Sequence, residues 1–166
     1  MNGDPVPAAA PRQGDALAPF RPRRGRAVAL GVVWGSLALF GAIAVLMPTQ
    51  TDGRWGVGDR VMFFGIGIVL AVVAWRYASI VAVPSRDGLV VRNLVLTRTL
   101  EWAEVVGVQF GGGEPWVSLD LEDGDTVAVM AIQKADGEVA GREASRLAAL
   151  VQAFGEAREP GGGQLP

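Results

Sequence analysis

The chain of 166 residues contains no cysteine and no histidine. The absence of cysteine excludes disulfides, thiolate metal sites and cysteine nucleophiles. The absence of histidine removes the side chain most often used as a general base near neutral pH, and it excludes nucleophiles that depend on a histidine partner. The sequence therefore predicts a protein that is not an enzyme, with no catalytic residue, cofactor or metal ion.

A glycine run and an acidic run each resemble part of a ligand-binding motif but lack residues that the motif requires. The run Gly111 to Gly113 lacks the Lys-Ser/Thr that follows the glycines of a phosphate-binding loop, so we interpret it as a hairpin tip. The acidic residues between Asp120 and Asp125 lack the ligand spacing and the terminal Glu of a calcium loop, and we interpret them as solvated turn charges. We also expect no nucleic-acid partner.

Two long apolar stretches are present. Ala27 to Met47 carries no charged residue, and Val61 to Trp75 is followed, after Arg76, by further apolar sequence up to Val83. A bilayer core of roughly 30 Å takes about 20 helical residues, so each stretch is long enough to span a membrane. The sequence predicts a two-span transmembrane hairpin over residues 27–83, with spans at 27–47 and at about 61–81.

Glycine pairs occur in both predicted spans. Gly31 and Gly35 have the small-xxx-small spacing, and Gly65 and Gly67 add thin surface to the second helix. Small residues let two membrane helices approach closely. We therefore expect these glycines to pack the two helices of the hairpin against each other.

The first 26 residues are rich in proline, alanine, glycine and arginine and show no periodicity, which predicts a disordered basic tail over residues 1–26. A signal peptide and a twin-arginine signal are the alternatives. The apolar run is longer than a cleavable core, and Gly25-Arg26 stand where a twin-arginine signal prefers apolar residues. We expect a retained span.

Arginines near the span ends predict the orientation, because Lys and Arg in short flanks favour the cytoplasmic side. The flank before the first span and the flank after the second are richer in arginine than the intervening loop, in which Asp52 and Asp59 accompany Arg54 and Arg60. We expect a multi-pass protein of the cytoplasmic membrane with both termini in the cytoplasm. The predicted anchors at the membrane interface are Arg23, Arg24, Arg26, Trp75, Arg76 and Tyr77.

From Ser79 onward the apolar period becomes two, which predicts β-strands separated by turn residues. About six strands are expected, at residues 80–83, 89–92, 96–102, 105–110, 116–121 and 126–132. The period then becomes helical, with Leu147, Leu150, Val151 and Phe154 on one face. The predicted fold class is α+β: the transmembrane hairpin, then a pleckstrin-homology-like (PH-like) antiparallel partial barrel capped by one carboxy-terminal helix, over residues 79–155, with a disordered tail at 156–166.

Three segments carry a resemblance to a known family. They are Arg-Pro-Arg-Arg-Gly before the spans, Val-Pro-Ser-Arg-Asp-Gly-Leu-Val-Val-Arg-Asn from residue 83, and Leu-Glu-Trp-Ala-Glu-Val from residue 100. Together they resemble the small bacterial PH-domain membrane proteins of the low-molecular-weight protein antigen 6 type, over about Arg21 to Phe154. The resemblance implies a PH fold at a membrane and brings no catalytic motif.

We expect most residues of these segments to have a structural role in the fold. Gly88 and Asn93 are expected to supply turns near positive φ, and Trp102 a large apolar surface. Arg86, Arg92 and Arg98 are the candidates for contact with the lipid surface, because loops at the start of better-known PH barrels bind phospholipid head groups. Each basic residue near an anionic surface contributes about 1 kcal/mol to binding.

The function predicted from these features is that of a non-enzymatic, membrane-anchored, PH-like interaction or scaffold module. Its expected partners are membrane lipids and either an unknown protein or a second copy of itself. One alternative is an anionic-lipid-sensing domain that uses the three arginines. Another is an accessory subunit of a transporter or of a cell-envelope complex.

Overall fold

The computed structural model describes residues 16–46 and 56–155. Residues 1–15 and 156–166 of the predicted tails, and residues 47–55 between the spans, lie outside the described residues. Two long helices come first, α2 (Arg23–Leu46) and α3 (Val57–Ala78). The domain that follows consists of β1 (Val81–Pro84), β2 (Gly88–Arg92), β3 (Thr97–Glu101), the short helix η1 (Trp102–Glu104), β4 (Val105–Gln109), β5 (Trp116–Leu121), β6 (Thr126–Gln133), the short helix η2 (Lys134–Asp136) and α4 (Glu138–Gly155).

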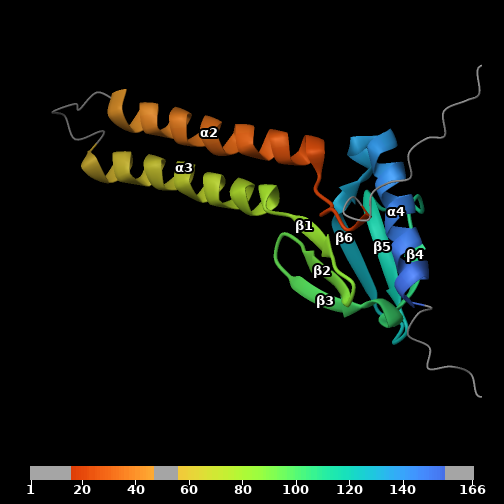
Figure 1. Ribbon diagram of the computed structural model, residues 1–166. Helices are drawn as coiled ribbons and strands as arrows, with labels where there is room; N and C mark the ends of the chain where they lie inside the picture. Colours follow the sequence, from red (N-terminus) through yellow and green to blue (C-terminus); the bar gives the residue numbers. More distant parts are fainter. Residues whose placement is uncertain (1–15, 47–55, 156–166) are drawn as a thin grey trace, which may run out of the picture.

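Helices α2 and α3 form an antiparallel hairpin that projects away from the rest of the protein (Figure 1). Both are long and apolar enough to cross a membrane. Only 17% of the apolar window of each helix is buried inside the protein, whereas the core helix of a soluble protein is mostly buried. Large side chains such as Trp34 and Val73 are exposed along the hairpin, as expected of surfaces that face lipid.

Helices α2 and α3 are in close contact at Gly67. A Cβ atom at this position would lie 2.6 Å from the Cβ atom of Phe40, so only glycine fits there. Gly31 and Gly35 have no atom within 4 Å of such a Cβ, and neither does Gly65. The expected packing role is therefore confirmed at Gly67 and wrong at Gly31, Gly35 and Gly65, because these three positions do not face the other helix.

The strands form two three-stranded antiparallel sheets, with orders β1-β2-β3 and β4-β5-β6. The predicted α+β class and the six strands are confirmed. Alternation of buried and half-exposed residues in β5 turns Val117, Leu119 and Leu121 inward. Helix α4 packs against β4, β6 and η1, with Leu147 and Leu150 buried in the core. Figure 1 shows α4 lying over the second sheet.

Trp102 fills one end of the core between the two sheets. Its side chain is 1% exposed, and its indole Nε1 donates a hydrogen bond to the carbonyl oxygen of Ser85 at 2.9 Å. Its ring stacks on that of Phe154 with 6.0 Å between the centroids. The predicted apolar role of Trp102 is thus accompanied by a polar contact that ties the start of β4 to the β1–β2 turn.

The predicted positive φ at Gly88 and Asn93 is wrong. Among the described residues, positive φ occurs only at glycines, namely Gly111, Gly113, Gly124 and Gly137. Gly88 is required for a different reason, because a Cβ atom there would lie 2.1 Å from the carbonyl oxygen of Leu100 on β3. Its role is close approach of two backbones.

Asn93 connects the two sheets through its side chain. Its Nδ2 donates to the carbonyl oxygen of Ala128 at 2.7 Å, and its Oδ1 accepts from the backbone N–H of Met130 at 3.2 Å. Both partners lie in β6, 35 and 37 residues away. Asn93 therefore satisfies backbone groups of the opposite sheet while its own N–H closes the β2–β3 turn on Leu96 at 2.9 Å.

The segment before the hairpin is part of the domain core. Phe20 is 1% exposed, and its backbone pairs antiparallel with Ala82 of β1 through hydrogen bonds of 2.8 and 3.1 Å. Helix α2 starts at Arg23. The sequence assigned residues 16–26 to a disordered tail; in the structure Phe20 packs in the core, the chain pairs with β1, and long-range polar contacts from α4 and η2 bind the residues on either side.

Candidate functional site

The most distinctive feature of the molecule is the junction between the hairpin and the domain. The segment at Phe20 pairs with β1 and is followed by α2. The chain then returns through α3 and continues, after Ser79 and Ile80, into β1 itself. The two helices therefore form an insertion between an edge segment and the strand beside it. Both ends of the hairpin join the domain on the same side (Figure 1).

The start of α2 is attached to the domain by Asp136 of η2. The carboxylate accepts hydrogen bonds from the backbone N–H groups of Arg23 and Arg24 at 2.9 and 2.8 Å. The first N–H groups of a helix have no partner within the helix, and a negative charge there also interacts favourably with the helix dipole. The guanidinium of Arg24 adds a bond to the carbonyl oxygen of Ala135 at 3.1 Å.

The end of α3 is attached through Tyr77. Its hydroxyl lies 3.1 Å from Oε1 of Gln133, a residue at the end of β6 that is 8% exposed. Gln133 in turn donates to the carbonyl oxygen of Met130 at 2.9 Å. Gly25 of α2 lies against both side chains, since a Cβ atom there would be 3.1 Å from each. Helices α2 and α3 and strand β6 therefore meet at one point.

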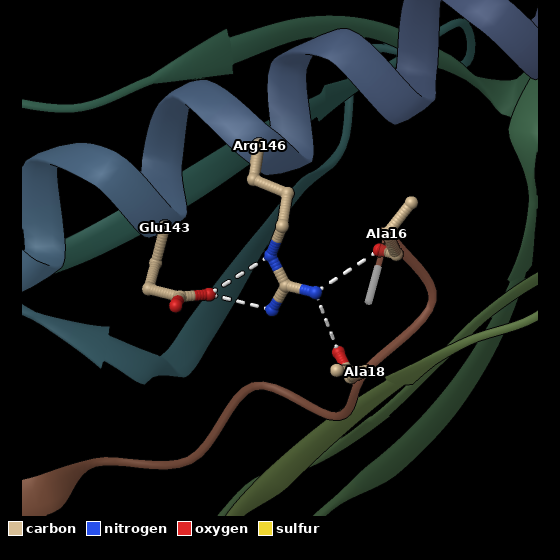
Figure 2. Close-up of polar contacts among 4 residues, drawn as sticks. All are labelled: Ala16, Ala18, Glu143 and Arg146. Atoms are coloured by element: carbon tan, nitrogen blue, oxygen red, sulfur yellow. Dashed lines mark hydrogen bonds and ion pairs between the residues drawn. The ribbon is translucent and has the colours of Figure 1, made fainter. Parts of the chain in front are cut away.

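Arg146 of α4 holds the segment that precedes the hairpin. Figure 2 shows its guanidinium donating to the carbonyl oxygens of Ala16 at 3.0 Å and Ala18 at 2.8 Å while it pairs with Glu143. The same group lies 3.9 Å from the centroid of the Phe20 ring. Charge-assisted bonds of this kind are stronger than neutral ones, so Arg146 fastens the chain on the amino-terminal side of Phe20.

The three arginines predicted to contact lipid are not brought together. Arg86 lies in the β1–β2 turn, at the end of β1 that is remote from α3. Arg92 lies at the opposite end of the β1–β2 hairpin, where it pairs with Val81. Arg98 on β3 pairs with Asp125 at 3.6 Å, with both side chains more than half exposed. Only Arg92 stands at the junction. The hairpin geometry of β1 and β2 separates residues that are close in the sequence.

The predicted interface anchors are mostly exposed, and some of them contact the domain. Trp75 is 59% exposed on the last turns of α3, and Arg23, Arg26 and Arg76 are also exposed. The side chains of Tyr77, which is half-buried, and of Arg24 and Arg76, which are exposed, also form hydrogen bonds with the domain.

The turn between β2 and β3 reaches back to the end of α3. Nε of Arg76 donates to the carbonyl oxygen of Leu94 at 3.2 Å, and the next two residues, Val95 and Leu96, are 77% and 70% exposed. Two adjacent apolar side chains with this exposure are unusual on a water-facing turn and fit a surface near a membrane. The apolar period of the sequence predicted a strand from Leu96, but β3 begins at Thr97 and Leu96 lies in the exposed turn.

Two clefts adjoin at the junction and share Arg21 and Arg26. The larger, of about 420 Å³, also contains the carboxylates of Asp136 and Glu143. The smaller, of about 230 Å³, is lined by Arg21, Arg26, Leu30, Trp75, Ala78, Ser79, Val81 and Arg92, which include no acidic residue. Sequence reasoning missed Arg21 as a site residue because its position beside β1 depends on the burial of Phe20.

Comparison with known proteins shows what the domain is similar to. Residues 83–149 match the family described as "Bacterial PH domain". The chain is similar to uncharacterized proteins of Mycobacterium bovis and Mycobacterium tuberculosis, at 36% identity over 105 residues in each case. These matches cover 63% of this chain and 63% of the length of either relative. No solved structure gives a significant match.

Proposed function

We propose that this protein is a non-enzymatic, membrane-anchored interaction module that presents its domain in a fixed orientation, because residues 83–149 match the bacterial PH domain family and follow two apolar helices. The observation that carries this proposal is the double attachment of the hairpin. A tether would need only one connection to hold a domain near a membrane. Here Phe20 and Asp136 connect the α2 end of the hairpin to β1 and η2, and Tyr77 connects the α3 end to β6, so the domain cannot turn independently of the spans.

The arginine distribution supports a cytoplasmic domain. Arg23, Arg26 and Arg76 are exposed at the domain end of the hairpin, where Arg21 and Arg92 also stand. Because basic residues next to membrane spans favour the cytoplasmic side, this end and the domain belong in the cytoplasm. The exposed Val95 and Leu96 directly follow Leu94, which Arg76 contacts, and would lie at the membrane interface. We infer a two-span protein of the cytoplasmic membrane with both termini in the cytoplasm.

The outer edge of β3 is the surface best suited to a protein partner. Strand β3 pairs only with β2 in the described part of the chain, and Thr97, Thr99 and Glu101 are exposed. An exposed strand edge offers unpaired backbone groups to an extended segment of another chain, so the edge of β3 can be extended by one strand. The binding function requires no catalytic group, in keeping with a chain that has neither cysteine nor histidine.

The test is affinity purification of the full-length protein, cross-linked in its native membrane, solubilised in mild detergent and analysed by mass spectrometry. The wild type is compared with Thr97→Lys/Thr99→Lys, which places charge on the β3 edge, and with a control, Thr126→Lys/Ser145→Lys, on other exposed positions. We expect a protein partner, or a second copy of the chain, with the wild type and the control but not with the edge variant. Recovery of no protein, or equal recovery with all three, would contradict the proposal. Recovery of a larger integral membrane protein would indicate that the chain is an accessory subunit of a transporter or of a cell-envelope complex.

A further inference from the structure

We propose that the smaller cleft at the junction, lined by Arg21, Arg26, Arg92, Leu30 and Trp75, binds the phosphate of an anionic phospholipid. We call it the junction cleft. This inference uses only the membrane anchoring in the proposed function and is independent of the β3 edge. The residues proposed to contact lipid lie together in space. Of these, only Arg92 is among the three arginines that the sequence suggested for lipid contact.

Strand pairing brings two of the arginines to one face. The pairing of Phe20 with Ala82 places Arg21 beside Val81, and the β1–β2 register places Arg92 on the other side of Val81. Directly opposed residues on neighbouring strands point to the same side of a sheet. Strands lie about 4.8 Å apart, so the Cα atoms of the two arginines are roughly 10 Å apart. Their long side chains can reach a common ion above Val81.

The third arginine arrives from the hairpin. Arg26 is in the first turns of α2, and Leu30 follows it on the same helix face because residues four apart are neighbours. Trp75 and Ala78 of α3 supply the opposite wall. The cleft is therefore cationic where it meets the domain and apolar where it meets the two helices.

The lining of the junction cleft contains no acidic residue, and the carboxylates of Asp136 and Glu143 line the adjoining larger cleft. None of the Arg21, Arg26 and Arg92 guanidiniums forms an ion pair or hydrogen bond within the described part of the chain, whereas Arg98 and Arg142 pair with carboxylates. Three like charges around one small cleft repel each other, and an anion in the cleft removes that repulsion. Guanidinium groups bind phosphate oxygens through paired N–H donors, so a phosphate ester matches the available donors.

The position of the cleft selects a lipid over a soluble phosphate. It lies at the last turns of α3 and the first turns of α2, where a spanning hairpin meets the head-group layer. Trp75, 59% exposed, is the type of residue enriched at that layer. A phospholipid can place its phosphate among the arginines and its glycerol and chains along Leu30 and Trp75. A soluble phosphate uses only the polar part of the cleft.

The experiment measures lipid retention by the full-length protein. The purified, delipidated protein in detergent is titrated with phosphatidylglycerol or with phosphatidylcholine, and bound lipid is counted by native mass spectrometry. The test variant is Arg21→Gln/Arg26→Gln/Arg92→Gln. The matched control, Arg86→Gln/Arg98→Gln/Arg142→Gln, removes the same number of charges from exposed positions outside the cleft. Unfolding temperatures and resistance to alkaline extraction from membranes are recorded for both.

We expect the wild type and the control to prefer phosphatidylglycerol and the cleft variant to lose affinity for it by roughly 100-fold, since each basic residue near anionic lipid contributes about a five-fold factor. Equal losses in the two variants would overturn the proposal, because they would indicate general surface attraction. Displacement of the lipid by inorganic phosphate at equal concentration would also overturn it in favour of a soluble ligand. A wild type extracted by alkali would instead contradict the membrane anchoring of the proposed function.

Discussion

The Oδ2 atom of Asp136 lies 2.9 Å from the backbone nitrogen of Arg23, although 113 residues separate the two along the chain. This bond joins the first turn of an apolar helix to the short turn that precedes α4. It belongs to a set of contacts that makes the hairpin and the domain one body. The fixed orientation of the domain depends on these contacts.

Replacing Asp136 by alanine is expected to lower the free energy of unfolding by about 1 kcal/mol, the typical cost of a lost helix cap. The change also exposes the Arg23 and Arg24 amides, so their hydrogen exchange should accelerate. Thermal unfolding in detergent and hydrogen-exchange mass spectrometry measure the two effects. Glu122→Ala, at an exposed turn position, is the control and should change neither value. Unchanged exchange in the Asp136 variant would mean that the cap contributes little to the attachment.

Phe20→Ala tests whether the segment before the hairpin is part of the domain core. The side chain is 1% exposed and lies under the Arg146 guanidinium, so its loss should cost about 3 to 5 kcal/mol. Chemical denaturation followed by tryptophan fluorescence measures the cost, and limited proteolysis should become possible near Ala18. Val106→Ala removes an exposed side chain of β4 and is expected to stay within about 0.5 kcal/mol of wild type. A Phe20 variant as stable as this control would show that the segment is dispensable.

Much of the domain follows from the sequence, because local patterns decide it. The expected strand 116–121 has the bounds of β5, and Leu147 and Leu150 are buried as the helical period predicts. The short polar turns after Pro84 and Leu121 also separate strands as expected.

The junction could not be predicted in the same way, because its contacts are long-range. Phe20 stands alone among prolines and arginines, and a single apolar residue has no period that could reveal a buried face. The partner of Arg23 is more than a hundred residues away. Arg86 and Arg92, two of the candidates for lipid contact, are close in the sequence, but Arg86 precedes β2 and Arg92 ends it, so the strand separates them.

Asn93→Ala should destabilise the protein by about 1 to 3 kcal/mol, because it leaves the backbone N–H of Met130 and the carbonyl of Ala128 without their partner. The effect is measured by urea denaturation and by hydrogen exchange at Met130. Gln109→Ala, which removes an exposed contact with Asp120, serves as the comparison and should cost much less. Equal costs would argue that Asn93 acts only as a turn residue.

Two glycine substitutions should change the free energy of unfolding in opposite directions. Gly88→Ala places a Cβ atom 2.1 Å from the Leu100 carbonyl oxygen, so β2 and β3 must separate, at a cost of about 3 kcal/mol or more. Gly141→Ala meets open space within α4 and should stabilise the protein by about 0.5 to 1 kcal/mol, since alanine favours the helix. Both values come from the same denaturation assay. A Gly88 variant that retains wild-type stability would contradict the close approach of these strands.

The most direct test of the central claim, that the hairpin holds the domain in one orientation, is a distance measurement by pulsed electron paramagnetic resonance in lipid vesicles. The chain has no native cysteine, so spin labels at Val72→Cys on α3 and Glu138→Cys on α4 are specific. We predict one narrow distance distribution, broadened when Phe20→Ala and Asp136→Ala are combined. A broad distribution in the otherwise wild-type protein would contradict the claim and leave the hairpin as a simple tether.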